Sequence, residues 1–278
     1  WLGRLHHFLR LLEVAVRAPF YDILFIQKVA VPVSIQRVLK RLNSNIVFDF
    51  DDSTFYLNND PSMVSHTFTN TKLIIVENEY NRAYAAQFNR NVLVVTGPID
   101  TDRYYPRGSK TQGEVVIGWI GHPQHRNYLL PLEDVFRFLC QKYPDLRIML
   151  IGSDPINMDG VNLVVREWSL DTEVADLHRF DIGIMPLDEK DGMALGKGGY
   201  KLLQYMSLGI PCVASPVEMN KELIREGENG FLAATPEEWI DRLSRLIEDE
   251  GARRAMGARG RRLALERYSF YAATPRLV

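Results

Sequence analysis

Residues 196–215 read GKGGYKLLQYMSLGIPCVAS, and this stretch decides the fold class. It predicts a glycine-rich turn, a helix over Tyr200–Leu208 and a strand over Pro211–Ser215. Gly209 stands where a helix commonly ends with a residue in the left-handed conformation. A turn, a helix and a buried strand in this order form one βα unit of a parallel sheet.

The same unit repeats outward from this stretch in both directions. We expect strands at Val115–Gly121, Arg147–Gly152, Val161–Arg166, Asp181–Leu187, Pro211–Ser215 and Gly230–Ala233. We expect helices at Tyr128–Lys142, Thr172–Phe180, Tyr200–Leu208, Glu218–Glu226, Pro236–Asp249 and Gly251–Arg267. Short apolar strands that alternate with amphipathic helices predict a doubly wound α/β domain over residues 111–278.

Residues 1–110 carry a shorter set of the same units. The expected helices are Leu2–Val16, Val33–Leu42 and Tyr80–Phe88, and the expected strands are Asp22–Gln27, Asn45–Phe50, Leu73–Glu77 and Val92–Thr96. Residues 97–113 carry turn and linker residues without periodicity, so the domain boundary is expected there. Because the chain begins at Trp1 inside an expected helix, we expect this N-terminal domain to be incomplete.

Composition narrows the function classes. A formal charge of -2 gives no global field that would recruit nucleic acid. Cys140 and Cys212 are far apart and lack a metal-ligand spacing, which favours a reducing, cytoplasmic setting and argues against disulfides or structural zinc. No apolar run reaches the length that spans a bilayer. The stripe of apolar residues in Leu2–Val16 fits a core-facing helix, with peripheral membrane contact as the alternative.

The glycine-rich turn predicts an anion site. Gly196, Gly198 and Gly199 permit close approach of a ligand, and the helix that follows points its unpaired amide N–H groups at the same place. Lys197, Lys201 and Gln204 share one face if the helix begins early enough. A diphosphate followed by a ribose would match that row. Solvated lysines beside an ordinary loop are the alternative.

Other candidate residues follow strands of the same domain. Gly121 and His122 end the first strand, and Arg126 beyond them can bind phosphate oxygens. His122 and His125 lack a third ligand, so no metal is expected there. Trp168 follows a strand, where it either flanks a nucleobase or is simply packed.

The stretch VFDFDDST at residues 47–54 places three carboxylates after an apolar run. Asp49 and Asp51 have the spacing of the first motif of haloacid dehalogenase-like phosphatases, and Asp154 with Asp159 imitates their Mg²⁺-binding pair imperfectly. An Asp-x-Asp metal motif is a third interpretation, which two βα repeats argue against. We expect Asp51 and Asp52 at the carboxyl end of a strand, where Asp52 either orients an acceptor hydroxyl or caps a turn.

The run from Val165 to Trp239 resembles the donor-binding half of family-four retaining glycosyltransferases. The resemblance rests on EWSLDTEVADLHRFDIGIMPL, GKGGYKLLQYMSLGIPCVASPVEMNKELI and EGENGFLAATPEEW, with IGWIGHP, PIDTDRYYP, FDFDDS and MGARGRRLALERYS elsewhere. It implies the GT-B architecture of two Rossmann-like domains, with the last helix crossing back to the N-terminal domain. One departure is that many members carry glutamates at the positions of Gly196 and Gln204.

The resemblance also implies a function. A hexose would pass from a nucleotide diphosphate sugar to a glycan or lipid-linked acceptor, with retained configuration and without a metal or other cofactor, in the cytoplasm or at the cytosolic face of a membrane. By position, the catalytic candidates are Lys201, Arg126 and Asp52, and the donor-binding candidates are Gly121, His122, Trp168, Lys197, Gly198, Gly199 and Gln204. The alternatives are a Mg²⁺-dependent phosphatase using Asp49 and Asp51, and an inactive nucleotide-sugar-binding subunit.

Overall fold

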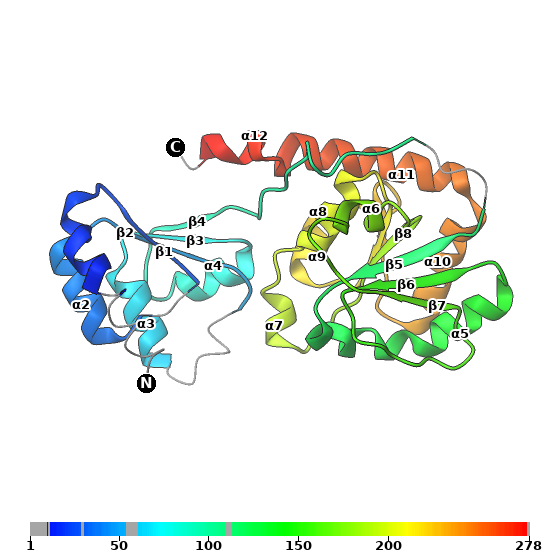
Figure 1. Ribbon diagram of the computed structural model, residues 1–278, viewed down its shortest axis with the longest axis horizontal. Coiled ribbons are helices and arrows are strands. Elements are labelled where there is room, and N and C mark those ends of the chain that lie inside the picture. The colour runs from blue at the N-terminus through cyan, green and yellow to red at the C-terminus, as the bar shows by residue number, and fades with distance from the viewer. Residues whose placement is uncertain (1–9, 11, 29–30, 54–60, 109–112, 277–278) are drawn as a thin grey trace. The chain divides into compact units, whose positions relative to one another are not determined.

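The computed structural model describes residues 10, 12–28, 31–53, 61–108 and 113–276 (Figure 1). The chain forms two compact units. The N-terminal unit comprises residues 1–96 with 195–198, and the C-terminal unit comprises residues 97–194 with 199–278. Most of the predicted helix Leu2–Val16 lies outside the described residues, so a membrane role for it stays a prediction.

The described part of the N-terminal unit contains a parallel sheet in the order β1-β2-β3-β4. Its strands are Leu24–Gln27, Ile46–Phe50, Leu73–Val76 and Val92–Val94, close to the predicted bounds. Helices α2 (Val33–Leu42) and α4 (Glu79–Ala85) were predicted, whereas α3 (Pro61–Asn70) was not. The sequence of α3 is rich in Ser, Thr and Asn, which are weak helix formers, and Phe68 of α3 stacks on Phe50 of β2 at 5.2 Å between ring centroids.

The described part of the C-terminal unit contains a parallel sheet in the order β10-β9-β8-β5-β6-β7. These strands are β5 Val116–Ile120, β6 Arg147–Ile151, β7 Leu163–Arg166, β8 Ile182–Met185, β9 Cys212–Ala214 and β10 Gly230–Leu232. Numbered within the unit, this is the doubly wound order 3-2-1-4-5-6 read from the other edge. The chain order reverses between β5 and β8, and ligands of such sheets bind beyond the carboxyl ends of the strands at that point.

Helices cover both faces of this sheet (Figure 1). One core cluster packs α5 (Glu133–Lys142) and α10 (Pro236–Glu248) against Ile117, Ile148 and Ile182. The other packs α6 (Glu173–Leu177), α8 (Tyr200–Ser207) and α9 (Glu218–Leu223) against the opposite side of the strands. Burial on both faces explains why these strands read as continuous apolar runs.

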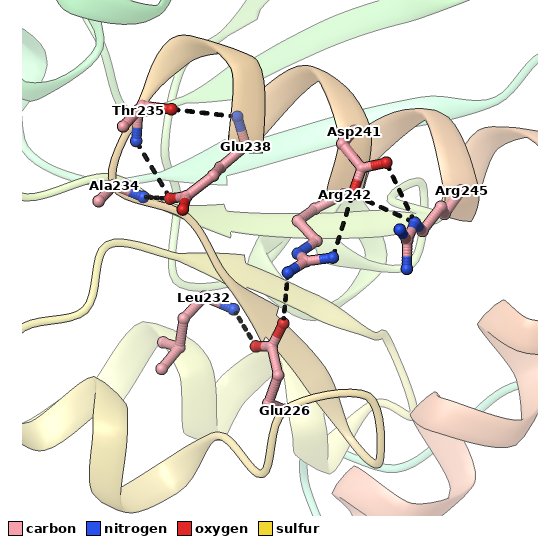
Figure 2. Close-up of polar contacts among 8 residues, drawn as sticks. All are labelled: Glu226, Leu232, Ala234, Thr235, Glu238, Asp241, Arg242 and Arg245. Carbon is pink, nitrogen blue, oxygen red and sulfur yellow. Dashed lines mark hydrogen bonds and ion pairs between the residues drawn. The ribbon is translucent and has the colours of Figure 1, made fainter.

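A glycine and a proline in the sequence mark where α8 ends and where α10 begins. Gly209 has φ of +71°, the left-handed conformation predicted for it. Pro236 opens α10 behind a capping box: Thr235 Oγ1 accepts from the Glu238 amide at 3.3 Å, and Glu238 Oε2 accepts from the amides of Ala234 and Thr235 at 2.7 and 3.3 Å (Figure 2). Arg242 in the next turn binds Glu226 at 3.1 Å, which ties α10 to the loop before β10.

Two expectations about this unit need correction. Helix α11 runs from Glu250 to Leu263, and residues Ala264–Tyr268 form a π-helical turn before the short α12 (Phe270–Ala273). Residues 97–104 are not a linker but part of the core. Ile99 and Tyr104 are 0% and 3% exposed, and the Ile99 amide donates to the Tyr268 carbonyl at 2.7 Å. The crossing of the last helix to the N-terminal domain stays a prediction.

Candidate functional site

Helix α8 is seated on the ends of β5 and β8 by Tyr205. The Tyr205 hydroxyl accepts from the Ile120 amide at 3.2 Å and donates to the Ile184 carbonyl at 3.4 Å. Its ring fills the space over Gly183, where a Cβ atom would lie 2.4 Å from Tyr205 Cδ2. Because Ile120 is the last residue of β5, the first turn of α8 lies at the carboxyl edge of the sheet, where the strand order reverses.

The N-terminus of α8 has the properties of an anion site. Gly199, its N-cap residue, has φ of +73°, a conformation that strains other residues. Within the part of the chain that the structure describes, no side chain caps this end. The amide N–H groups of the first turn therefore remain donors, at the positive end of the helix dipole.

Lys201 lies beside this end of the sheet. Its Nζ is 5.6 Å from the centroid of the Trp119 ring, and its Cε lies 3.1 Å from the place where a Cβ on Gly121 would be. Gly121 thus leaves the room that the lysine occupies. The side chain is half-buried, which strengthens the attraction between its charge and a phosphate.

Trp168 lies at the same edge of the sheet, in the loop after β7. Gly152, after β6, has φ of +77°, and a Cβ on it would lie 2.7 Å from the Gly121 carbonyl oxygen and 3.1 Å from Trp168 Cβ. The loops after β5, β6 and β7 therefore touch one another. The structure brings together three of the predicted site residues, Gly121, Trp168 and Lys201.

Arg126, another predicted residue, lies on a short 3-10 helix, Pro123–Tyr128, and His122 directly precedes that helix. His122 caps this helix, since its Nδ1 accepts from the Gln124 amide at 3.3 Å. Arg126 has an exposed side chain. Among the described residues, no group of three His, Cys, Asp or Glu side chains could hold a metal ion. The donor contacts predicted for His122 and Arg126 stay predictions.

Gln204 is buried, with 4% of its surface exposed. Its Nε2 donates to the Tyr104 hydroxyl at 3.2 Å, and Tyr104 donates in turn to Glu173. Sequence reasoning missed both partners, because Tyr104 stands in the expected linker and Glu173 looks like an ordinary residue of a helix start. The ribose contact predicted for Gln204 stays a prediction.

The turn at Gly196–Gly198 belongs to the N-terminal unit, where two asparagines hold it. Asn78 Nδ2 donates to the carbonyls of Gly196 and Lys197 at 2.8 and 3.2 Å, and Asn81 Nδ2 donates to the Gly196 carbonyl at 3.0 Å. Both asparagines are fully buried at the start of α4. Sequence reasoning missed them, although two asparagines at N-cap spacing directly after a strand were a signal.

Two glycines of this turn are required by close packing. A Cβ on Gly196 would lie 1.7 Å from Ser53 Oγ, and a Cβ on Gly198 would lie 1.9 Å from Glu77 Oε2. A glutamate in place of Gly196, which the resemblance implies for many relatives, does not fit against Ser53 in this conformation. Lys197 between them is buried, with 7% of its surface exposed.

Charged residues gather at the carboxyl edge of the N-terminal sheet. Lys28 after β1 forms an ion pair with Asp51 after β2, and Asp49 accepts from Gln27 at 2.9 Å. Lys28 and Asp52 have φ of +61° and +48°, a conformation that costs non-glycine residues free energy. Asp52 accepts from Asn81 through its backbone carbonyl at 3.3 Å.

Glu77, which follows β3, is a residue of this edge that sequence reasoning missed. Its burial raises the pKa of the carboxyl to about 8, and the negative charges of Asp51 and Asp52 add to that rise. Burial also raises the pKa of Asp49. The signal in the sequence was a carboxylate placed directly after the apolar run LIIV.

The geometry at α8 agrees with what comparison with known families finds. Residues 114–249 match the family Glycosyl transferases group 1. The matching segment contains Gly121, Trp168, Lys201 and the whole glycine-rich turn. Comparison with curated protein sequences finds no significant match.

Solved structures of glycosyltransferases share the GT-B fold of this chain. HepE from Anabaena, solved with UDP and glucose, matches with a TM-score of 0.73 and 15% identity over 96% of this chain and 79% of its own. Sucrose-phosphate synthase from Thermosynechococcus elongatus matches with a TM-score of 0.70 and 14% identity over 92% and 72%. The pneumococcal O-GlcNAc transferase GtfA, solved with UDP and GlcNAc, matches with a TM-score of 0.65 and 14% identity over 88% and 53%. The chain therefore spans about half the length of GtfA.

Proposed function

We propose that this chain is a retaining glycosyltransferase that moves a hexose from a nucleotide diphosphate sugar to a glycan or lipid-linked acceptor. The observation that carries the proposal is the coincidence of two findings. The segment that matches the glycosyltransferase family contains the free helix N-terminus of α8, and Lys201 lies beside it where the strand order of the sheet reverses.

The proposed chemistry is electrostatic. The bond between the anomeric carbon and the diphosphate oxygen breaks, and negative charge builds up on the departing diphosphate. Lys201, Lys197, Arg126 and the amides at Gly199 are proposed to stabilise that charge. Because these cations supply the positive charge, the reaction is proposed to need no metal ion.

Retention of configuration follows if the acceptor hydroxyl attacks on the face from which the diphosphate leaves. The new bond then forms between the acceptor oxygen and the anomeric carbon, and the hydroxyl proton passes to a phosphate oxygen of the leaving group. Asp52 is proposed to orient the acceptor hydroxyl through its carboxylate. Its left-handed backbone at the end of β2 fits a residue held in place for function.

The phosphatase alternative has less support. In this structure Asp49 lies within β2, and its carboxylate already accepts a hydrogen bond from Gln27 at 2.9 Å. The inactive-subunit alternative draws on Gly196, which offers no side chain to the donor sugar. Activity measurements separate these alternatives.

The proposed setting is the cytoplasm or the cytosolic face of a membrane, without nucleic-acid partners. In the part of the chain that the structure describes, no helix has the length and apolar character needed to cross a bilayer.

We expect the chain to release the nucleoside diphosphate from at least one UDP-, GDP- or ADP-sugar, faster when a glycan or lipid-linked acceptor is added. The same rate is expected with EDTA and with added Mg²⁺. The measurement is chromatographic detection of the nucleoside diphosphate and the transferred sugar. Binding without release or transfer for every donor would favour the inactive subunit, and EDTA-sensitive hydrolysis of a simple phosphate ester would favour the phosphatase.

A further inference from the structure

Glu173 is a buried carboxylate that gathers hydrogen-bond donors from separate parts of the C-terminal unit. It stands at the first position of α6 and has 6% of its surface exposed. Its Oε2 accepts from the indole Nε1 of Trp168 at 2.6 Å, and its Oε1 accepts from the hydroxyl of Tyr104. Arg103 lies 3.6 Å from Oε1 and supplies a positive charge. A buried carboxylate with these partners is held in one position, because moving it would leave a buried charge unpaired.

A chain of hydrogen bonds runs from Gln204 of α8 through Tyr104 to Glu173, and each residue donates to the next. Because the Tyr104 hydroxyl donates its proton to Glu173, its oxygen is an acceptor, and Gln204 Nε2 donates to it at 3.2 Å. Burial and the contact with Glu173 raise the pKa of Tyr104, so the phenol keeps its proton at physiological pH. Glu173 therefore connects Trp168 with Gln204, the residues predicted for the nucleobase and the ribose.

Trp168 presents an exposed aromatic ring whose orientation is fixed. Its side chain is 48% exposed, while its Cβ packs beside Gly152 and its N–H is bound to Glu173. The hydrogen bond at Nε1 fixes the rotation of the indole ring. An exposed ring without such a bond would lose conformational entropy when a ligand orders it. An exposed indole in one orientation offers a stacking face to a purine or pyrimidine base.

We propose that Glu173 is a positioning residue that holds Trp168 in the orientation that receives the nucleobase of the donor, and that steadies Gln204 through Tyr104. The inference rests on the proposed function. Only a carboxylate serves here, because it accepts hydrogen bonds from both Trp168 and Tyr104 and pairs its negative charge with Arg103. A glutamine has one acceptor oxygen, and its amide hydrogens would meet a donor N–H or O–H group.

The test compares two probes of the same site in the whole chain. Nucleoside diphosphate binding depends on the Trp168 ring that receives the base, whereas inorganic pyrophosphate lacks a base and depends on α8 and Lys201. We expect Glu173→Gln to weaken binding of the preferred nucleoside diphosphate about 5- to 30-fold, the effect of one lost buried hydrogen bond. Pyrophosphate affinity and kcat at saturating donor are expected to change less than about 3-fold. Glu167→Gln, next to Trp168 and exposed, is the matched control and should change neither affinity.

A second variant keeps the proposal testable if Glu173→Gln fails to fold. Trp168→Phe keeps an aromatic face at an exposed position but removes the N–H that binds Glu173. It should weaken nucleoside diphosphate binding to a similar degree, and adding Glu173→Gln to it should weaken binding little further.

Each outcome separates this inference from the proposed function. Unchanged nucleoside diphosphate affinity in Glu173→Gln or in Trp168→Phe, or equal losses for both probes, would overturn the positioning role while leaving a nucleotide site in place. A wild-type chain that binds neither probe would overturn the proposed function, and the positioning role with it.

Discussion

Lys201→Ala is expected to lower kcat/KM for the nucleotide sugar by about 10²- to 10³-fold, the usual cost of removing one group that stabilises the charge of a transition state. The physical reason is the position of this lysine at the free N-terminus of α8, half-buried against Trp119 and Gly121. Steady-state kinetics with the preferred donor measures the effect. Lys201→Arg should recover only part of the activity, since a planar guanidinium differs from an ammonium in shape and in the directions of its N–H groups.

Lys190→Ala is the matched control for this variant. Lys190 is an exposed lysine in the loop after β8, and its replacement should leave kcat/KM within about 2-fold. The thermal unfolding midpoint of Lys201→Ala should stay close to that of the wild type, because the lysine is not part of either core cluster of the unit. Wild-type kinetics in Lys201→Ala would remove this residue from the mechanism.

Glu77→Gln is expected to change how the stability of the N-terminal unit depends on pH. The pKa of Glu77 is about 8 in the folded chain, against an ordinary value of 4.5. Below pH 4.5 the carboxyl is protonated in both the folded and the unfolded states, so its contribution to stability is fully present. As pH rises from 4.5 through 8, the unfolded chain releases the proton first and that contribution is lost. The loss is on the order of 5 kcal/mol.

The amide of a glutamine resembles the protonated carboxyl and does not titrate. Glu77→Gln should therefore match the wild type near pH 5 and exceed its stability near pH 9. Hydrogen exchange of the amides in β2 and β3, corrected for the pH dependence of intrinsic exchange, measures the difference locally. Glu79→Gln, two residues away with a mostly exposed side chain, should keep the wild-type pH dependence. Parallel pH curves for Glu77→Gln and wild type would show that Glu77 is not held protonated.

The pattern of strands and helices was predictable because its causes are local. Strands such as β5 are buried on both faces and read as continuous apolar runs, and Gly209 and Pro236 mark helix boundaries through their own backbone preferences. Helix α3 escaped prediction because its formation depends on packing against β2 more than on its own residues. Residues 97–104 read as a linker because of their turn residues.

The contacts that bury residues 97–104 come from far along the chain. Arg261 donates to the carbonyls of Thr101 and Tyr104 at 3.0 and 2.7 Å. The residues of the candidate site likewise divide into those with a local sequence signal and those that only long-range contacts bring together. Gly121, Lys201 and the glycine-rich turn carry a local signature of an anion site. Asn78 looks like an ordinary helix cap in the sequence, and only the folded chain brings its side-chain amide to the Gly196 carbonyl.

The proposed function requires the C-terminal unit to bind the diphosphate of a nucleotide where β5 and β8 end. Calorimetric titration of UDP, GDP and ADP into the wild-type chain, first in EDTA and then with Mg²⁺, tests it most directly. We predict saturable binding of at least one nucleotide in EDTA, at one site per chain, and clearly weaker binding in Lys201→Ala. The absence of binding for all three nucleotides under both conditions would contradict the claim.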